Sequence, residues 1–191
     1  MNYTNLITII IPCYNEINFL ETVIQRVLDT KIQNKQVIIV DDFSTDGTRE
    51  LLKSKIEPLV DKVIYHEKNM GKGACIKNAL QFIAGDIVII QDADLEYNPS
   101  DHPKLVKVMI DRNVDVVYGT RFSKGTKNSN LNLYLTNRIA NFLLTVFTNF
   151  LTGLKISDME TGLKCFKKEA IQGINLIENR FGFEPEVTIK L

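Results

Sequence analysis

The chain has 191 residues, of which 45% are hydrophobic, so it is long enough for one α/β domain with a real core. Its 23 basic and 23 acidic residues cancel, which argues against a nucleic-acid binder that relies on a broad basic surface. The three cysteines are odd in number and far apart, which argues for a reducing compartment and against a disulfide framework or a zinc site.

Short β-rich runs alternate with helical patterns along the first 119 residues. This alternation predicts an α/β fold, with a mostly parallel sheet covered by helices. We expect strands at 6–11, 36–40, 62–66, 86–90 and 114–119, and helices at about 19–28, 48–56, 72–83 and 99–110. Each strand ends in a polar or glycine-containing loop, and ligands bind at that edge of open α/β sheets.

The pattern changes after residue 120. Residues 123–132 are polar, which predicts a mobile loop. The helix expected at 133–152 has one narrow polar stripe and is otherwise apolar, so it is either a mostly buried helix with one wet edge or a surface that meets lipid. Its most apolar stretch, Ile139–Leu151, is too short and too polar to span a bilayer of about 30 Å. Because no signal peptide is visible either, we expect a cytoplasmic location.

Acidic side chains follow the strand expected at 86–90, in the sequence QDADLE (91–96). Residues i and i+2 of an extended segment point to the same side, so Asp92, Asp94 and Glu96 can converge. Hard oxygen ligands of this kind suit Mg²⁺ or Mn²⁺, which also bind waters and phosphate oxygens. An acidic turn that caps the next helix would give the same short pattern.

A second acidic pair, Asp41 and Asp42, follows the strand expected at 36–40. These carboxylates can accept hydrogen bonds from a ribose hydroxyl or a base N–H, while the following STDGT residues form the turn into the next helix. A turn alone would explain the later residues better than the two adjacent acids.

Two further loops carry weaker signals. IPCYNE (11–16) ends the first strand, and its aromatic and polar side chains fit either a ligand or a turn. NMGKGAC (69–75) opens a helix, and Lys72 with the exposed amides there suits a phosphate, although the spacing is not that of a P-loop.

Three downstream clusters are polar as well. GTR (119–121) puts Arg121 after the fifth strand, SDMETGLK (157–164) includes Asp158 and Glu160, and RFGFEPE (180–186) is rich in charge. Each fits a loop ion pair taken alone, but ion pairs do not explain why so many clusters fall at strand ends. The two histidines, His66 and His102, have no evident partners and are expected to be structural.

Taken in order, IPCYNE, VDDFSTDGT, NMGKGAC, QDADLE, GTRF, DMETGLKCF and FGFEPE resemble the motifs of glycosyltransferase family 2. The branch that they resemble contains the dolichyl- and polyprenyl-phosphate sugar synthases, and the resemblance runs from about Leu6 to the last residue. It implies a GT-A (Rossmann-like) fold with helices on both faces of the sheet. It also implies one catalytic domain over 1–191, with a nucleotide- and metal-binding part at about 1–120 and an acceptor side at about 121–191.

The resemblance further implies an inverting transfer of mannose or glucose from a GDP- or UDP-linked donor to a polyprenyl or dolichyl phosphate, with Mg²⁺ or Mn²⁺. Most family members continue into membrane-associated helices, so we expect a C-terminal truncation and a full-length protein at the cytoplasmic face of a membrane. The nucleotide-binding residues implied by position, together with Lys72, are Pro12, Tyr14, Glu16, Asp41, Asp42 and Asp92. The metal ligands that the resemblance implies are Asp92, Asp94 and Glu96. The residues implied to bind the acceptor phosphate are Arg121 and Arg138. The catalytic residues implied are Asp94, Asp158 and Arg121.

The sequence departs from the family at two positions, because glutamine is common at Glu96 and arginine at Lys164. The acceptor decides whether a base is needed. A polyprenyl phosphate is already anionic, whereas a sugar hydroxyl would require Asp158 or Glu160 to remove its proton.

Other functions remain as alternatives. A family 2 glycosyltransferase that acts on a saccharide hydroxyl and a non-catalytic nucleotide-binding module share the same motifs. A phosphoacceptor receiver domain would place its paired acids after the first strand, not the second. A sugar-nucleotide-forming nucleotidyltransferase would need a glycine-rich basic loop where this chain has CYNEIN (13–18).

Overall fold

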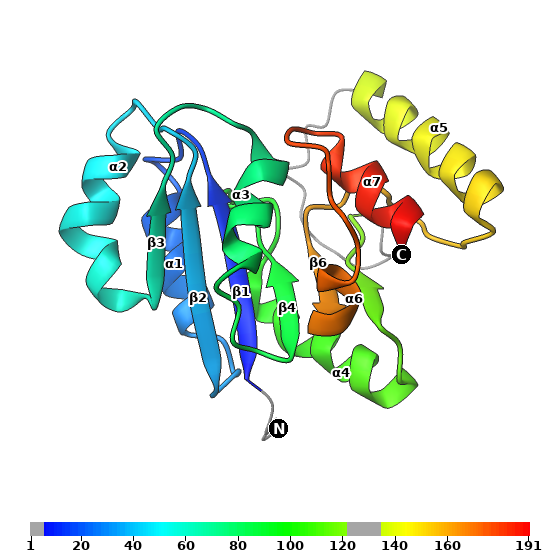
Figure 1. Cartoon of the computed structure of the whole chain (residues 1–191), viewed down its shortest axis with the longest axis horizontal. Helices are drawn as coiled ribbons and strands as arrows, with labels where there is room; N and C mark the ends of the chain where they lie inside the picture. Colours follow the sequence, from blue (N-terminus) through cyan, green and yellow to red (C-terminus); the bar gives the residue numbers. More distant parts are fainter. Residues whose placement is uncertain (1–5, 122–134) are drawn as a thin grey trace.

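The computed structural model describes residues 6–121 and 135–191, with the backbone alone for 135–138. The loop expected at 123–132 lies outside the described residues. Six strands form one sheet in the order β3-β2-β1-β4-β6-β5 (Figure 1). Their bounds are β1 (Ile7–Cys13), β2 (Lys35–Asp41), β3 (Lys62–Tyr65), β4 (Ile87–Ile90), β5 (Val116–Tyr118) and β6 (Lys164–Lys167).

The sheet is mostly parallel, as the alternating pattern predicts. β1 pairs in parallel with β2 and β4, and β2 pairs in parallel with β3. Only β6 runs against its neighbours, β4 and β5. This strand is absent from the sequence-based expectation, and it adds residues from the last third of the chain to the sheet.

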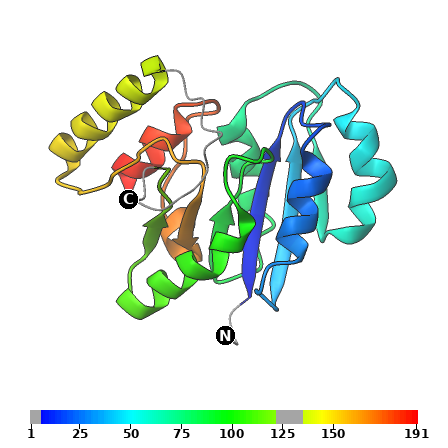
Figure 2. The same ribbon diagram turned by 180° about the vertical axis from the view of Figure 1, so that it is seen from behind.

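Helices cover both faces of the sheet, as expected (Figures 1 and 2). One face packs against α1 (Leu20–Leu28), α2 (Thr48–Leu51) with the π-helical turn η1 (Leu52–Ile56), and α4 (His102–Arg112). The other face packs against α3 (Lys72–Leu80), α6 (Lys168–Gln172) and α7 (Phe183–Lys190). The short 3₁₀ turns are η2 (Glu57–Leu59) and η3 (Pro99–Asp101).

The alternation of side chains along the strands divides the core into two layers. In β1, Ile9 and Ile11 join the layer under α1, whereas Ile10 joins the layer under α3. All three are fully buried. A strand that is buried on both faces reads as a continuous apolar run, which is why β1, β2 and β4 can be predicted from sequence.

The long helix α5 (Leu135–Thr152) stands outside these layers, beside α7 (Figures 1 and 2). Its polar stripe faces the protein, where Asn141, Thr145 and Thr148 are buried. The apolar side faces outward, with Phe142 66% exposed and Phe150 82% exposed. The expectation of a mostly buried helix with a solvated polar edge is therefore wrong, because the polar edge of α5 is buried and its apolar side is exposed. None of the helices in the described part of the chain has the length and hydropathy to cross a bilayer.

Candidate active site

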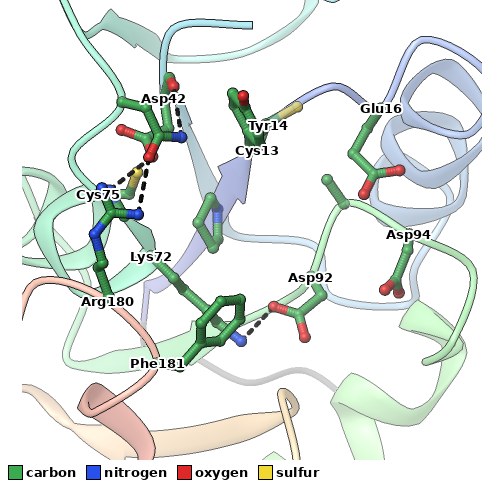
Figure 3. A pocket seen from close by; sticks show the side chains of 14 residues that line it. Cys13, Tyr14, Glu16, Asp42, Lys72, Cys75, Asp92, Asp94, Arg180 and Phe181 are labelled. Carbon is green, nitrogen blue, oxygen red and sulfur yellow. Dashed lines mark hydrogen bonds and ion pairs between the residues drawn. The ribbon is translucent and has the colours of Figure 1, made fainter.

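A cleft of about 390 Å³ opens at the carboxyl ends of the parallel strands (Figure 3). Its walls come from the loops after β1, β2 and β4, from the start of α3, and from the segment before α7. The lining residues are Pro12, Cys13, Tyr14, Glu16, Asp42, Asn69, Gly71, Lys72, Cys75, Asp92, Ala93, Asp94, Arg180 and Phe181. The structure thus brings together Tyr14, Asp42, Asp92 and Asp94 as the strand-end argument requires.

The loops after β1 and β2 are clasped together by hydrogen bonds. The backbone N–H of Asn15 donates to Ser44 Oγ at 2.9 Å, and Asn15 Oδ1 accepts from the Thr45 N–H at 2.8 Å. Glu16 is fixed in the same way, because its N–H donates to Thr48 Oγ1 at 2.9 Å. Asn15 and Phe43 have positive φ angles of 56° and 66°, a conformation that such a clasp can hold. The clasp sets the position of the wall that carries Tyr14 and Glu16.

The Asp42 carboxylate joins the end of β2 to the loop before α3. It accepts hydrogen bonds from His66 Nδ1 at 2.7 Å, the Met70 N–H at 2.8 Å and the Gly71 N–H at 2.7 Å. His66 therefore has partners, contrary to the sequence-based expectation, since Asn78 also bonds its Nε2 at 2.8 Å. Asp42 lines the cleft with its carboxylate oxygens already engaged.

Asp41 points elsewhere. It is fully buried, and Arg49 Nη2 lies 2.7 Å from its Oδ2. Neighbouring residues in an extended segment face opposite sides, so only one of the two adjacent acids can line the cleft. The structure thus separates Asp41 from the other residues predicted to bind the nucleotide.

Three carboxylates face one another on the other side of the cleft, those of Glu16, Asp92 and Asp94 (Figure 3). Burial, with the nearby charges of Asp94, Asp46 and Asp92, raises the pKa of Glu16 to about 7. Burial and the charges of Asp92 and Glu96 also raise the pKa of Asp94, although the Glu96 N–H donates to its Oδ1 at 2.9 Å. A cation placed beside these acids would relieve their mutual repulsion.

Lys72 supplies one positive charge to this group. Its Nζ lies 2.7 Å from Asp92 Oδ1 and 2.9 Å from Glu184 Oε1. Burial opposes the charge of this ammonium, but the two carboxylates outweigh burial and raise the pKa of Lys72. Gly162 of the DMETG sequence packs against the same aspartate, because a Cβ at that position would lie 1.7 Å from Asp92 Oδ2.

Arg121 and Asp158 form a second, separate cluster. Arg121 donates from Nε and Nη2 to the two oxygens of Asp158, both at 2.8 Å, and from Nη1 to Glu96 Oε1 at 3.2 Å. Burial alone would raise the pKa of Asp158, but the hydrogen bonds and charge of Arg121 lower it below its ordinary value. Asn141 of α5 adds a hydrogen bond to Asp158 Oδ1 at 2.9 Å.

This second cluster changes the predicted metal site. Glu96 turns to Arg121 and lines a neighbouring pocket of about 380 Å³ with Tyr97, Gly119 and Arg121. It does not line the cleft of Asp92 and Asp94, so the structure does not gather the three predicted metal ligands around one point. The side chain of Arg138 lies outside the described residues.

Sequence reasoning did not place Arg180 and Phe181 in this cleft. Arg180 contacts Asn69, which lies 111 positions earlier in the chain. A contact between residues so far apart in sequence cannot be predicted from a local pattern. The charged RFGFEPE sequence by itself fits a loop ion pair equally well.

A buried cluster beside the cleft contains metal-ligand atoms within 4.8 Å of one another, from Asp42, His66 and Cys75. Its chemistry fits a hydrogen-bonded node better than a metal site. The Asp42 oxygens are taken by His66 and two backbone amides, and burial with the charge of Asp42 raises the pKa of the Cys75 thiol. The hard carboxylates of Asp92 and Asp94 are the better ligands for a divalent ion.

The fold and this cleft define an α/β protein with an acidic ligand site at the strand ends, and the comparisons with known proteins agree. The sequence profile of glycosyl transferase family 2 matches residues 8–174. The chain is 30% identical over 187 residues to a dolichol-phosphate mannosyltransferase from Pyrococcus furiosus, with 96% of this chain and 52% of the relative aligned. It is also 30% identical to a UDP-N-acetylglucosamine–dolichyl-phosphate N-acetylglucosaminyltransferase from Methanococcus voltae, with 87% of this chain and 71% of the relative aligned.

Among solved structures, the chain resembles a mannosyltransferase from Pyrobaculum calidifontis in complex with GDP-Man and Mn²⁺. The TM-score is 0.68 at 23% identity, with 97% of this chain and 51% of the neighbour aligned. This likeness establishes the GT-A fold. The chain belongs to glycosyltransferase family 2. It spans about half the length of the Pyrococcus relative and of the Pyrobaculum structure.

Proposed function

We propose that this chain is the catalytic part of a metal-dependent, inverting glycosyltransferase. It transfers a hexose, mannose or glucose, from a GDP- or UDP-linked donor to a polyprenyl or dolichyl phosphate. The observation that carries this proposal is the single cleft in which Pro12, Tyr14 and Asp42 face Asp92 and Asp94 (Figure 3). The relatives named above support it, since both bear names of transferases that use a dolichyl phosphate.

The donor lies along the cleft in this proposal. The nucleoside occupies the end formed by Pro12, Tyr14 and Asp42, and the diphosphate extends toward Asp94. Asp92 and Asp94 would hold Mg²⁺ or Mn²⁺, because their carboxylates are hard ligands whose mutual repulsion a cation relieves. When bound, such an ion neutralises the diphosphate and acts as a Lewis acid toward the leaving oxygen.

The protein's own groups orient the donor. Lys72 lies in the cleft wall next to Asp92, where its ammonium can meet a phosphate oxygen as well as the carboxylates. The Tyr14 side chain is 47% exposed and offers an aromatic face to the nucleoside. Glu16 closes the acidic side of the cleft, and a cation bound there would lower its raised pKa.

The acid–base properties of Asp158 favour a phosphate acceptor over a hydroxyl acceptor. A hydroxyl nucleophile needs a general base, and its pKa should lie near the working pH. Asp158 is 1% exposed, is bound to Arg121, and has a lowered pKa, so it is a poor base. A hydroxyl acceptor would therefore depend on Glu160, whose pKa burial and the charge of Glu184 raise. A lipid phosphate is already ionised and needs a cation to position it, a role that we assign to Arg121 and, by sequence, to Arg138.

The outward face of α5 fits the same acceptor. Its exposed apolar residues are Ile139, Phe142, Leu143, Leu144, Val146, Phe147, Phe150 and Leu151. A helix with such a face can lie in the interface plane of a bilayer. We therefore propose that the protein acts at the cytoplasmic surface of a membrane, where the lipid acceptor lies.

A transfer assay tests this proposal. Purified protein is incubated with radiolabelled GDP-mannose, UDP-glucose or UDP-N-acetylglucosamine in Mn²⁺ or EDTA. The acceptor is polyprenyl phosphate in vesicles in one set of reactions and a mixture of oligosaccharides in the other. Label should appear in the lipid fraction with GDP-mannose or UDP-glucose in Mn²⁺, and it should disappear in EDTA. Label from UDP-N-acetylglucosamine alone would contradict the proposed sugar. Label on a saccharide hydroxyl would favour the alternative acceptor, and donor binding without any transfer would favour a non-catalytic nucleotide-binding module.

A further inference from the structure

The segment 177–181 is held against the start of α3 at the rim of the cleft. The Ala74 N–H donates to the Asn179 carbonyl at 3.0 Å, and Lys77 Nζ donates to the Ile177 carbonyl at 2.8 Å. Gly71 permits this approach, because it has a φ of +95° and a Cβ there would lie 2.5 Å from the Asn179 oxygen. Arg180 is therefore carried by an anchored backbone, although its side chain is exposed.

The Arg180 guanidinium lies on the Asp42 side of the cleft, away from Asp94 (Figure 3). Its Nη1 donates to Asn69 Oδ1 at 3.3 Å, and Asn69 Nδ2 donates to the Asp42 carbonyl at 3.4 Å. Arg180 takes part in none of the ion pairs formed among the side chains that the structure describes. By contrast, two carboxylates neutralise Lys72, the other cation of the cleft. Arg180 thus keeps its charge and its remaining N–H donors for a ligand.

We propose that Arg180, with Asn69, reads the edge of the donor's base and selects a base that carries a carbonyl oxygen there. This inference rests on the proposed function. If the diphosphate reaches the carboxylates of Asp92 and Asp94, the base must occupy the opposite end of the cleft, where Pro12, Asp42 and Arg180 meet.

The selection follows from the hydrogen-bonding groups. A guanidinium only donates, through five N–H groups in a fixed fork. Guanine O6 and N7 and uracil O4 accept, and arginine forms a two-pronged contact with the O6/N7 edge of guanine in nucleic-acid recognition. Adenine and cytosine carry an amino group at the equivalent position, so the N–H groups of the base would face the N–H groups of Arg180 and no hydrogen bond could form. A polar site rejects such mismatched ligands strongly, because its own groups are then left unpaired.

Nucleotide binding measured by calorimetry in Mn²⁺ tests this role. The matched pairs are GDP with ADP, and UDP with CDP. The members of the second pair differ only along one edge: C4 carries a carbonyl in uracil and an amino group in cytosine, and the adjoining N3 donates in uracil and accepts in cytosine. For whichever of GDP and UDP binds tighter, the wild-type protein should prefer it over its amino partner by at least about tenfold. Arg180→Ala should lose about tenfold in affinity for that carbonyl nucleotide and change little for its amino partner, so that discrimination within the pair disappears.

Arg112→Ala, which removes an exposed arginine at the end of α4, serves as the matched control and should bind like the wild type. Equal losses for both members of a pair would overturn the proposal and make Arg180 a phosphate contact. Unchanged discrimination in Arg180→Ala, or no discrimination in the wild type, would also overturn it. If no nucleoside diphosphate binds the wild type in Mn²⁺, the proposed function itself fails, and this result is distinct from the others.

Discussion

Lys72 bridges the cleft aspartate Asp92 and the buried Glu184: its Nζ lies 2.7 Å from Asp92 Oδ1 and 2.9 Å from Glu184 Oε1. Glu184 belongs to α7, so this one ammonium ties the loop after β4 to the last helix of the chain. The predicted phosphate contact is therefore also a structural ion pair.

Lys72→Met should destabilise the protein, because it leaves Glu184 and Asp92 without their cation. The side chain of Glu184 is only 3% exposed, and stranding a buried charge costs about 3–5 kcal/mol. Urea unfolding measures this loss, and Lys68→Met, at an exposed position between β3 and α3, is the control. Adding Glu184→Gln to Lys72→Met should recover part of the stability. A single variant as stable as the control would contradict the bridge.

Asp94→Asn should remove metal-dependent transfer without harming the fold. Burial and neighbouring acids already raise the pKa of Asp94, so the loss of its charge relieves repulsion in the ligand-free protein. A charge pair at about 4 Å is worth about 4 kcal/mol at an effective dielectric near 20, so turnover in Mn²⁺ should fall by at least about 100-fold. Thermal unfolding reports the fold, and Asp111→Asn on the exposed face of α4 should keep both properties. Near-normal turnover in Asp94→Asn would exclude the metal role.

The parts of the fold that follow from local pattern could be predicted. β1 and β4 are continuous apolar runs, and the loops after them meet because parallel strands end at one edge of a sheet. β6 could not be found in this way, since Lys164 and Lys167 flank its two apolar residues. Lys164 is nevertheless buried, and its ammonium donates to the carbonyls of Met159 and Thr161, partners that only the tertiary structure supplies.

The same limit applies to the candidate site. The sequence predicted that Asp42, Asp92 and Asp94 share one cleft, but it did not separate Asp41 from Asp42. In the structure Asp41 pairs with Arg49, whereas Asp42 accepts hydrogen bonds from the backbone N–H groups of residues 70 and 71. It also grouped Glu96 with the metal ligands, although Arg121 draws that carboxylate into the neighbouring pocket. Both differences arise from partners that lie far away in sequence.

Arg121→Lys should impair use of the lipid phosphate far more than binding of the donor. Lysine keeps the charge but loses the two-pronged contact that arginine makes with both oxygens of Asp158. The KM for polyprenyl phosphate should rise by about tenfold or more, while the Kd for the nucleoside diphosphate in Mn²⁺ changes by less than about threefold. If donor affinity falls and acceptor kinetics are kept, Arg121 belongs to the donor site.

Acid should destabilise the protein through His102. This side chain is fully buried, its Nε2 is 2.8 Å from Gln91 Oε1, and burial lowers its pKa from 6.5 to about 4. Between these values the unfolded chain binds a proton that the folded chain does not, so the free energy of unfolding falls as pH falls from 6.5 to 4. The loss is at most about 3 kcal/mol.

Urea unfolding at pH 6.5, 5.5 and 4.5 checks the His102 prediction. His102→Gln has no such proton to bind, so the stability difference between the wild type and this variant should shift against the wild type as pH falls. A difference that stays constant across the three pH values would show that His102 does not titrate in this way.

Phe147→Ser with Phe150→Ser should weaken binding to anionic lipid vesicles without lowering stability. Both rings lie on the outer face of α5, with Phe147 61% and Phe150 82% exposed, so the folded protein gains little from burying them. Insertion of one such side chain into an apolar phase contributes about 1.5–3 kcal/mol, so the double variant should partition at least about tenfold more weakly in vesicle sedimentation. Leu59→Ser is the control, because Leu59 is 55% exposed beyond the opposite end of the sheet, next to β3. Equal sedimentation of the double variant and this control would show that the apolar face of α5 does not meet the membrane, and the donor cleft would then have to receive its acceptor by another route.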